Sequence, residues 1–341
     1  MHPAIKQQVL LAAAGVGLGL AARALVRKVA ELDLRGKTVL ITGGSRGLGL
    51  VLARTFADEG TSLVLCARDP EALERARAEL AQRGAQVLAI PCDVTDRAQV
   101  KSLVDAARQR FGQIDVLVNN AGLIQVGPME VQTLDDYEAA MNTHFWGPLF
   151  TILEVLPEMR ERRSGRIVNI SSIGGKISVP HLLPYSASKF ALVGLSEGLR
   201  AELAKDGIAV TTVTPGLMRT GSPLQATFKG QNEKEYTWFA ISDSLPVLSV
   251  SAARAAREIV RACRRGAAEL TLTLPAQLAI PFHGVLPGLT ADLLGLLNGL
   301  LPAPGGIGKE KALGLESQTT VSRAWAAWAT SAARENNELA A

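Results

Sequence analysis

A tyrosine and a lysine, Tyr185 and Lys189, stand four positions apart in the chain. On a helix this spacing places a phenol and an ammonium on the same face, one turn apart. A free phenol has a pKa of about 10, and a neighbouring cation shifts that pKa toward neutrality. The pair alone is a weak signal, because two amphipathic side chains commonly share a helix face. In the right surroundings it predicts proton transfer to or from a substrate oxygen.

Three further motifs accompany this pair. An apolar stretch at 166–171 reads as a buried parallel strand, and Ser172 directly after it precedes Tyr185 by 13 positions (185 − 172). A turn at 42–49 carries glycines at its first, fifth and seventh positions after Thr42 and follows an apolar strand. The sequence Asn-Asn-Ala-Gly at 119–122 follows another apolar strand. Each motif is weak by itself, but their order and spacing are specific together.

Together these motifs resemble the classical short-chain dehydrogenase/reductase family, over about residues 37–274. The resemblance implies that Ser172 hydrogen-bonds the substrate oxygen and that Tyr185 exchanges a proton with it. It implies that Lys189 lowers the pKa of Tyr185 and fixes the cofactor ribose, while hydride passes between a nicotinamide and a carbonyl carbon. Ser171 is the rival for Ser172, but alternation along the strand turns Ser171 to the opposite face.

The family's fourth catalytic position is an asparagine three residues before a glycine, and here His144 precedes Gly147 at that spacing. Asn142 lies two residues out of register, which turns it to another face of a helix. In the family this position helps to hold a water that links the lysine to solvent, and a neutral imidazole at His144 can donate or accept in such a chain. The alternative is that His144 is a hydrogen-bonded core side chain, while backbone carbonyls hold the water.

Strand and helix patterns alternate from Gly36 onwards, which indicates a parallel sheet covered on both faces. Helical periodicity is clearest over Pro70–Arg83 and Asp96–Phe111. We therefore expect an α/β, Rossmann-like, doubly wound seven-stranded parallel sheet, with a ligand crevice beside the first strand at the carboxyl ends. The strands are predicted at 38–42, 62–67, 86–91, 115–119, 166–171, 208–214 and 269–274.

The glycine-rich turn at 42–49 predicts a dinucleotide site. Glycines allow the tight turn and let backbone N–H groups approach a pyrophosphate at a helix N-terminus. Arg46 in the turn and Arg68 at the end of the second strand suit a ribose 2′-phosphate, so NADP(H) is favoured over NAD(H). The expected cofactor-binding residues are Gly43, Ser45, Arg46, Gly47, Leu48, Gly49, Arg68, Asp93, Val94, Asn120, Ala121, Gly122, Tyr185, Lys189, Pro215, Gly216 and Thr220.

Several of these assignments have specific roles or alternatives. Asp93 resembles the family residue that meets the adenine amino group, and its alternative is a turn or N-cap acid before the helix at 96. Asn119 is expected to be structural, since a side-chain amide can tie neighbouring strand ends together. Thr220, after the Pro-Gly turn at 215–216, is placed by the resemblance near the nicotinamide carboxamide.

An aromatic segment follows that turn and extends to Leu248. The resemblance makes it a substrate lid, and its aromatic residues agree with an apolar substrate of steroid-, retinoid- or acyl-lipid-like character. The alternative is that the aromatic residues only pack within the lid. A rival for the whole protein is a catalytically silent NADP(H)-binding sensor or membrane scaffold. The aromatic residues are Phe228, Tyr236, Trp238 and Phe239.

Composition narrows the classes of partner. The chain has 341 residues, is 48% hydrophobic and carries a net charge of +4 with scattered arginines, which speaks against a nucleic-acid partner. Cys66, Cys92 and Cys263 are odd in number and far apart, as expected for core residues in a reducing compartment. The four histidines show no ligand spacing, so no metal site is predicted. The resemblance also suggests a homodimer or homotetramer, paired through the helices of the His144 and Tyr185 motifs.

Apolar segments flank the predicted catalytic domain. Val9–Val26 predicts a helix about 27 Å long, marginal for a membrane span, whose alternatives are packing on the domain or a cleaved signal peptide. Pro275–Gly308 contains one charged residue, Asp292, and its leucine spacing predicts an apolar helix stripe. We expect this stripe to lie on a membrane surface, and the alternative is packing on the protein itself or on a second copy. The stripe comprises Leu289, Leu293, Leu296 and Leu300.

These observations divide the chain into an N-terminal segment 1–35, a catalytic domain 36–275 and a C-terminal extension 276–341. The basic residues beside the N-terminal apolar run lie on the domain side, as expected for a catalytic domain in the cytoplasm. We therefore expect a membrane-associated protein with a cytoplasmic catalytic domain, and the alternative is a soluble cytoplasmic protein.

Overall fold

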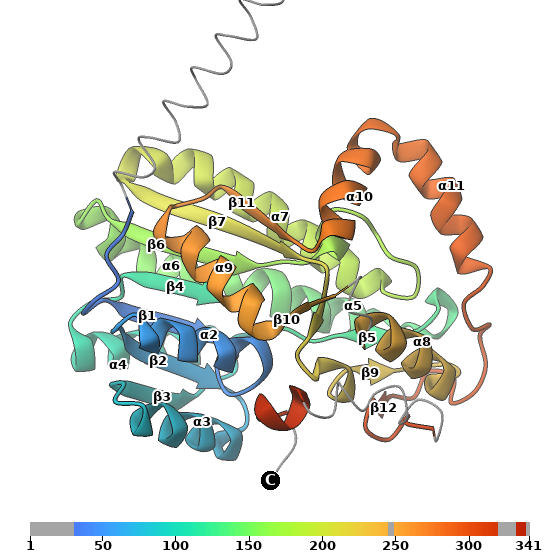
Figure 1. The fold of residues 1–341 in the computed structure, drawn as a ribbon, viewed down its shortest axis with the longest axis horizontal. Helices are drawn as coiled ribbons and strands as arrows, with labels where there is room; N and C mark the ends of the chain where they lie inside the picture. Colours follow the sequence, from blue (N-terminus) through green and yellow to red (C-terminus); the bar gives the residue numbers. More distant parts are fainter. Residues whose placement is uncertain (1–30, 245–248, 320–331, 339–341) are drawn as a thin grey trace, which may run out of the picture.

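A seven-stranded parallel sheet forms the centre of the computed structural model, which describes residues 31–244, 249–319 and 332–338 (Figure 1). Its strand order, β11-β7-β6-β4-β1-β2-β3, reverses the direction of winding beside β1. The predicted Rossmann-like fold is confirmed, and each predicted strand end lies within two residues of the observed one. The strands are β1 Thr38–Thr42, β2 Ser62–Ala67, β3 Val87–Pro91, β4 Val116–Asn119, β6 Gly165–Ile170, β7 Ile208–Pro215 and β11 Glu269–Leu272.

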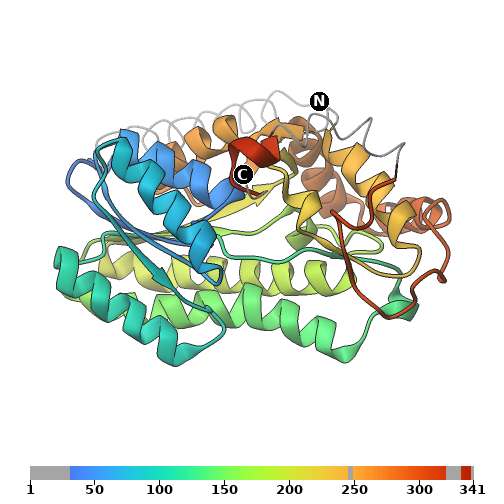
Figure 2. The same cartoon turned by 90° about the horizontal axis from the view of Figure 1, so that it is seen from below.

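Helices cover both faces of this sheet (Figure 2). One face carries α2, α3 and α9, and the other carries α4, α6 and α7. Because the strands are covered on both sides, consecutive residues such as Val39, Leu40 and Ile41 are all fully buried. These helices are α2 Gly47–Asp58, α3 Pro70–Gln82, α4 Arg97–Phe111, α6 Gly147–Glu161, α7 Leu183–Leu203 and α9 Ala252–Arg264.

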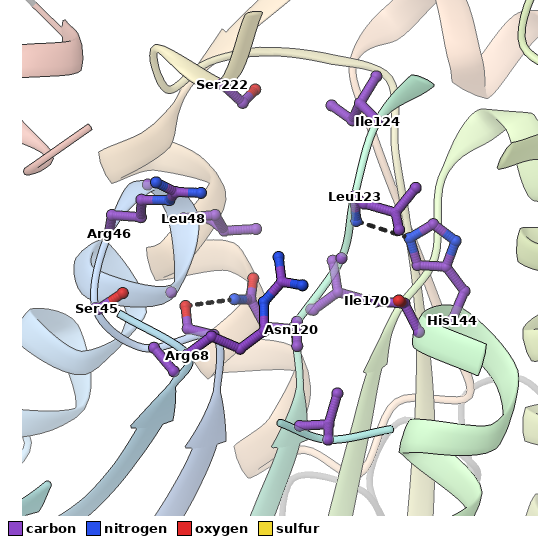
Figure 3. Close-up of a pocket in the computed structure, with 18 of the residues that line it drawn as sticks. Ser45, Arg46, Leu48, Arg68, Asn120, Leu123, Ile124, His144, Ile170 and Ser222 are labelled. Atoms are coloured by element: carbon purple, nitrogen blue, oxygen red, sulfur yellow. Dashed lines mark hydrogen bonds between the residues drawn. The ribbon is translucent and has the colours of Figure 1, made fainter. Parts of the chain in front are cut away.

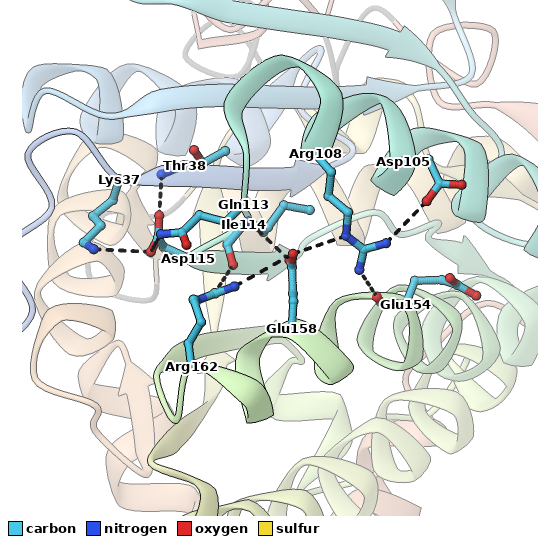
Figure 4. Close-up of polar contacts among 10 residues, drawn as sticks. All are labelled: Lys37, Thr38, Asp105, Arg108, Gln113, Ile114, Asp115, Glu154, Glu158 and Arg162. Carbon is cyan, nitrogen blue, oxygen red and sulfur yellow. Dashed lines mark hydrogen bonds and ion pairs between the residues drawn. The ribbon is translucent and has the colours of Figure 1, made fainter.

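At the amino-terminal ends of the strands, side-chain carboxylates connect neighbouring strands and helices (Figure 4). Asp115 accepts the backbone N–H of Thr38 at 3.0 Å and so ties the start of β1 to the start of β4. Glu158 on α6 accepts the N–H of Ile114 at 3.2 Å and pairs with Arg108 of α4 at 3.2 Å. These contacts hold the layers together at the end remote from the predicted crevice.

A small second layer of structure was not predicted. Strands β5, β9 and β12 form one three-stranded sheet, and β8 pairs with β10. The fully buried Lys229 after β9 forms an ion pair with the fully buried Asp136 of α5, which Lys311 also contacts at 2.8 Å. The elements are β5 Gln125–Val126, α5 Leu134–Met141, β8 Leu217–Arg219, β9 Thr227–Phe228, α8 Asn232–Ser244, β10 Ser249–Ser251 and β12 Ala312–Leu313.

The aromatic residues predicted for the lid belong to this layer. Phe228, Tyr236 and Phe239 form a buried cluster, and Trp238 packs against it while donating its indole N–H to the Glu235 carboxylate at 2.7 Å. These aromatic residues therefore pack within the lid, which was the alternative to a role in contacting an apolar substrate.

Two short helices after β11, α10 Leu274–Val285 and α11 Pro287–Asn298, form a hairpin that projects from the domain (Figure 1). Leucines of the predicted stripe stay exposed on it, from 45% for Leu293 to 83% for Leu300. Among the described residues, no helix is both long and apolar enough to cross a bilayer. The predicted helix at 9–26 lies outside the described residues.

Candidate active site

Ser172, Tyr185 and Lys189 come together where β6 ends and α7 begins. Ser172 follows β6 at the N-cap of a short 3-10 turn, where its hydroxyl accepts the N–H of Gly174 at 3.1 Å, and its proximity to Tyr185 acts to lower the pKa of the phenol. The ammonium of Lys189, one helical turn after Tyr185, lies 5.7 Å from the centre of the phenol ring. Ser171 faces the other way and donates to the backbone carbonyl of Lys189 at 3.2 Å. The Ser171 hydroxyl is thus engaged with the backbone of α7, whereas Ser172 acts on the tyrosine.

Burial controls the protonation of this pair. It lowers the pKa of Lys189 to about 7, and the Lys189 ammonium donates to the Ile170 carbonyl at 2.9 Å. Burial also raises the pKa of Tyr185, and the Ser172 hydrogen bond acts in the opposite direction. The predicted lowering of the Tyr185 pKa by Lys189 is therefore wrong for this state, because desolvation of the phenol outweighs the favourable contacts.

His144 lies in a π-helical turn, Asn142–Trp146, between α5 and α6, and it is fully buried. The Leu123 N–H donates to its Nε2 at 3.1 Å (Figure 3), so the ring proton sits on Nδ1. Nδ1 lies 2.8 Å from the Ser188 hydroxyl, which in turn donates to the Tyr185 carbonyl at 2.8 Å. Burial, followed by the charge of Lys189, holds the pKa of His144 well below its usual value.

Both ring nitrogens of His144 are therefore paired with protein groups, which corrects the expectation that this side chain holds a water beside Lys189. His144 is a hydrogen-bonded core side chain, as the alternative interpretation of the sequence predicts. Its edge still faces the Tyr185 ring, with ring centres 5.3 Å apart, so His144 supports the turn that carries the phenol.

A cavity of about 350 Å³ opens beside these residues at the carboxyl ends of the strands. Figure 3 shows Arg46 and Arg68 on one side of it and His144 on the other. The predicted cofactor residues that line it are Gly43, Ser45, Arg46, Gly47, Leu48, Gly49, Arg68, Asp93, Val94, Asn120, Ala121, Gly122, Tyr185, Lys189 and Thr220.

Pro215, Gly216 and Ser172 do not line this cavity, so their assigned roles stay predictions. Pro215 is the last residue of β7 and pairs with Leu272 of β11. A Cβ on Gly216 would lie 2.3 Å from the Thr273 hydroxyl, so this glycine is needed for packing. Lining residues that sequence reasoning missed are Cys66, Ala67, Asp69, Cys92, Leu123, Ile124, Thr143, Ile170, Ser171, Met218, Ser222 and Glu338.

The glycine turn fits a pyrophosphate. A Cβ on Gly49 would lie 2.0 Å from the Gly43 carbonyl oxygen, and Gly43 itself has a φ of +64°, so both positions require glycine. The Asn120 side chain donates to the Thr42 and Gly43 carbonyls at 3.0 and 3.1 Å and fixes the turn. No side chain caps the N-terminus of α2, whose N-cap residue is Arg46, as suits a helix end that receives an anion.

Two other predicted residues have structural contacts. Asn119 donates to the Asn169 side chain at 2.9 Å and accepts from Thr151 at 2.6 Å, tying β4 to β6 and α6. The Asp93 carboxylate accepts the N–H of Thr95 at 2.9 Å, which is the turn alternative, although Asp93 also lines the cavity. Asp96, the neighbouring acid, caps α4.

Comparisons with known proteins agree with this architecture. A family model described as short chain dehydrogenase matches residues 37–229. Dehydrogenase/reductase SDR family member 7B of Bos taurus is 36% identical over 268 residues, covering 76% of this chain and 81% of that protein. The SDR family protein 7-like of Anopheles gambiae is 40% identical over 198 residues, covering 57% of this chain and only 62% of that protein's length.

Solved structures show the same fold. A short-chain dehydrogenase from Streptomyces avermitilis has a TM-score of 0.67 and 32% identity, covering 78% of this chain and 98% of that one. An actinorhodin polyketide ketoreductase solved with NADPH has a TM-score of 0.63 and 31% identity, covering 70% and 96%. The chain therefore belongs to the classical short-chain dehydrogenase/reductase family of oxidoreductases.

Proposed function

We propose that this protein is an NADP(H)-dependent oxidoreductase that interconverts a carbonyl and a secondary alcohol on a hydrophobic substrate. One observation carries the proposal: a single cavity joins the Tyr185–Lys189 pair to the arginines Arg46 and Arg68. One cavity thus holds a proton donor for the substrate together with a pair of phosphate-binding cations for the cofactor.

The side chains divide the reaction between them. The bound dinucleotide supplies or accepts hydride. Ser172 hydrogen-bonds the substrate oxygen, and Tyr185 donates its proton to that oxygen during reduction. Burial keeps the Tyr185 phenol protonated until the substrate arrives, because it raises the phenol pKa. Lys189, with a pKa of about 7, can release or take up a proton near neutral pH.

The choice of NADP(H) rests on charge. Arg46 and Arg68 both line the cavity at the glycine-turn end, where the ribose 2′-phosphate of NADP(H) would need cationic partners. The ketoreductase solved with NADPH offers a parallel for this cofactor. Replacing Arg68→Asp introduces a repelling charge, so the NADPH-to-NADH ratio of kcat/KM should fall sharply or invert. An unchanged ratio would refute the choice of cofactor.

Carbonyl-dependent oxidation of NADPH across a panel of apolar ketones and aldehydes tests the whole proposal. We expect turnover with at least one member, and turnover that is slower by about 10²- to 10⁴-fold with Tyr185→Phe. A protein that binds NADPH tightly but turns over no member would support the silent sensor or scaffold instead.

A hydrophobic substrate is supported by a second cavity of about 500 Å³. One of its walls is the segment 178–183, which leads directly into the helix of Tyr185. Residues from 128–130 and from 298–304, where α11 ends and the chain leaves the exposed hairpin, complete the lining. Proline, leucine, valine and methionine dominate this lining, as in sites for apolar ligands.

We further propose that the α10–α11 hairpin rests on a membrane surface, with the catalytic domain in the cytoplasm. Its exposed leucines and near absence of charge suit insertion into the lipid interface. Leu296→Asp with Leu300→Asp should weaken flotation with lipid vesicles, and deletion of residues 1–30 should weaken it further. Leu313→Asp with Leu315→Asp, two exposed leucines outside the hairpin, is the matched control. Equal flotation of all variants would contradict the proposal.

A homodimer through α6 and α7 is also proposed. Trp146, Leu153 and Phe190 are each exposed by more than 40% in the single chain. Burying such side chains against a second copy would remove them from water. Sedimentation equilibrium should report a dimer that Leu153→Asp with Phe190→Asp dissociates, and a monomeric wild type would exclude this interface.

A further inference from the structure

The C-terminal residues 332–338, which we name the C-terminal strap, lie beside the predicted cofactor cavity, and Glu338 is part of its lining. Figure 1 draws them in red beside α2. On one side the Asn336 carbonyl accepts the N–H of Gly47 at 2.9 Å, and the Asn337 side chain donates to the Ser45 carbonyl at 2.8 Å. On the other side Gln225 donates to the Glu338 carbonyl at 2.6 Å. The strap therefore bridges the glycine turn and the segment after β8.

The Glu338 side chain is aimed into the cavity. It is 6% exposed, lines the cavity and stands so close to the helix start that a Cβ on Gly47 would lie 2.5 Å from its Oε1. Its Oε2 lies 3.4 Å from Nε of Arg46 and, among the described residues, has no hydrogen-bond partner. Burial raises the pKa of Glu338 to about 7, while the charge of Arg46 acts in the opposite direction.

This position is the one that a dinucleotide needs. The N-terminus of α2 attracts a pyrophosphate through its backbone N–H groups, and the strap already takes the Gly47 N–H. Arg46, a proposed partner of the 2′-phosphate, already faces the Glu338 carboxyl. Two anions at one helix end repel each other, so carboxylate and phosphate exclude one another there.

We propose that the C-terminal strap is an autoinhibitory element, in which Glu338 stands in for the cofactor phosphates and must leave before the dinucleotide binds. The ligand it excludes is NADP(H), so this inference rests on the proposed function in that respect. The apparent affinity then falls by the fraction of molecules with an open strap. A strap closed in about nine molecules of ten weakens binding about tenfold.

Two variants open the strap by different routes. Glu338→Gln removes the competing charge. Asn337→Ala removes the hydrogen bonds of Asn337 to Ser45, Ala72 and Arg75, and it places alanine at a backbone φ of +57°. Both should bind NADPH about five- to tenfold more tightly than the wild type in a fluorescence titration. Glu335→Gln, an exposed acid on the same segment, is the matched control and should leave the dissociation constant unchanged.

Weaker binding by Asn337→Ala would overturn the proposal, since the strap would then be a clamp that closes over bound cofactor. Equal binding by the wild type and both variants would overturn it as well. Thermal melting checks that each variant is folded. If one is not, the wild type alone decides: trypsin cleavage after the exposed Arg334 should accelerate when NADPH is added, and slower or unchanged cleavage refutes release of the strap.

Inorganic pyrophosphate serves as a second probe, because it reports on the glycine turn whichever dinucleotide the enzyme uses. Tighter pyrophosphate binding by the variants, with no binding of NADPH, would support the autoinhibitory role of the strap and reject NADP(H) as the cofactor. Unchanged binding of both probes would reject the autoinhibitory role of the strap. The proposed function would still be tested by the carbonyl-dependent oxidation of NADPH.

Discussion

Replacing His144 tests whether its ring is buried and neutral and supports the helical turn that carries Tyr185. In the folded protein both ring nitrogens are hydrogen-bonded, and burial holds the pKa well below its usual value of 6.5. The unfolded chain, by contrast, takes up a proton on this histidine as the pH falls through about 6.5. Because the unfolded state binds more protons in this range, acid selectively stabilises it, and His144 makes the free energy of unfolding decrease as the pH falls.

The size of this effect follows from the linkage relation. Between pH 8 and pH 5.5 the unfolded histidine gains about RT ln(1 + 10), or about 1.4 kcal/mol, while the folded one gains almost nothing. His144→Asn removes the titrating ring and leaves an amide that retains part of the hydrogen bonding. We expect the wild type to lose about 1.4 kcal/mol more stability than the variant over this interval.

Urea unfolding at pH 8 and pH 5.5, followed by circular dichroism, measures the difference between the two proteins. Other groups titrate equally in both, so the double difference isolates His144. His283→Asn, on the projecting helix α10, is the control for removing a histidine outside the site. Parallel loss of stability in the wild type and His144→Asn would refute the assignment of a neutral, buried ring. We also expect His144→Asn to retain turnover, since asparagine is the family residue at this position.

Three further substitutions probe the site and its support. Tyr185→Phe removes the transferable proton, so kcat should fall by about 10²- to 10⁴-fold with NADPH affinity retained. Tyr236→Phe, which loses only a hydrogen bond with Gln318, is its control in the same kinetic assay. Gly49→Ala forces a Cβ to within 2.0 Å of the Gly43 carbonyl and should abolish NADPH binding or lower the melting temperature, whereas Gly194→Ala, with open space around its Cβ, should do neither. Lys229→Met leaves the buried Asp136 carboxylate with Lys311 as its remaining cationic partner, beside the backbone N–H of Thr133. It should reduce the free energy of unfolding by about 3–5 kcal/mol in urea titrations, whereas an unchanged midpoint would mean that the pair contributes nothing net.

Local patterns explain why much of the fold was predictable. The buried run Val39-Leu40-Ile41 and the capping acid Asp96 each carry their signal within a few residues. The predicted pairing of Ser172 with Tyr185 likewise agrees with the structure, in which Ser172 acts to lower the pKa of the phenol.

Other features depend on contacts between distant segments. The two-residue strands β5, β9 and β12 are too short to show any period, and their sheet forms only when three remote segments meet. The hydrogen bonds of His144 to Leu123 and Ser188 connect positions that no motif links, so spacing showed the residue but not its partners. Glu338 reaches Arg46 across almost the whole chain, and a single acid near the C-terminus carries no sequence signal for that contact.

The burial of Glu338 bears on what the strap is for. An unpaired carboxyl oxygen in a dry site is unfavourable, and an apolar side chain at this position would hold the strap in place without that cost. Because the pKa of Glu338 rises from 4.5 to about 7, the folded state binds a proton that the unfolded state has released, so stability from this contact falls as the pH rises through that interval. The Glu338 contact therefore stabilises the closed strap less at neutral pH than at acidic pH. Such weakening would be unfavourable in a segment with a purely structural role. In an autoinhibitory strap it allows a phosphate-bearing ligand to displace the Glu338 carboxyl.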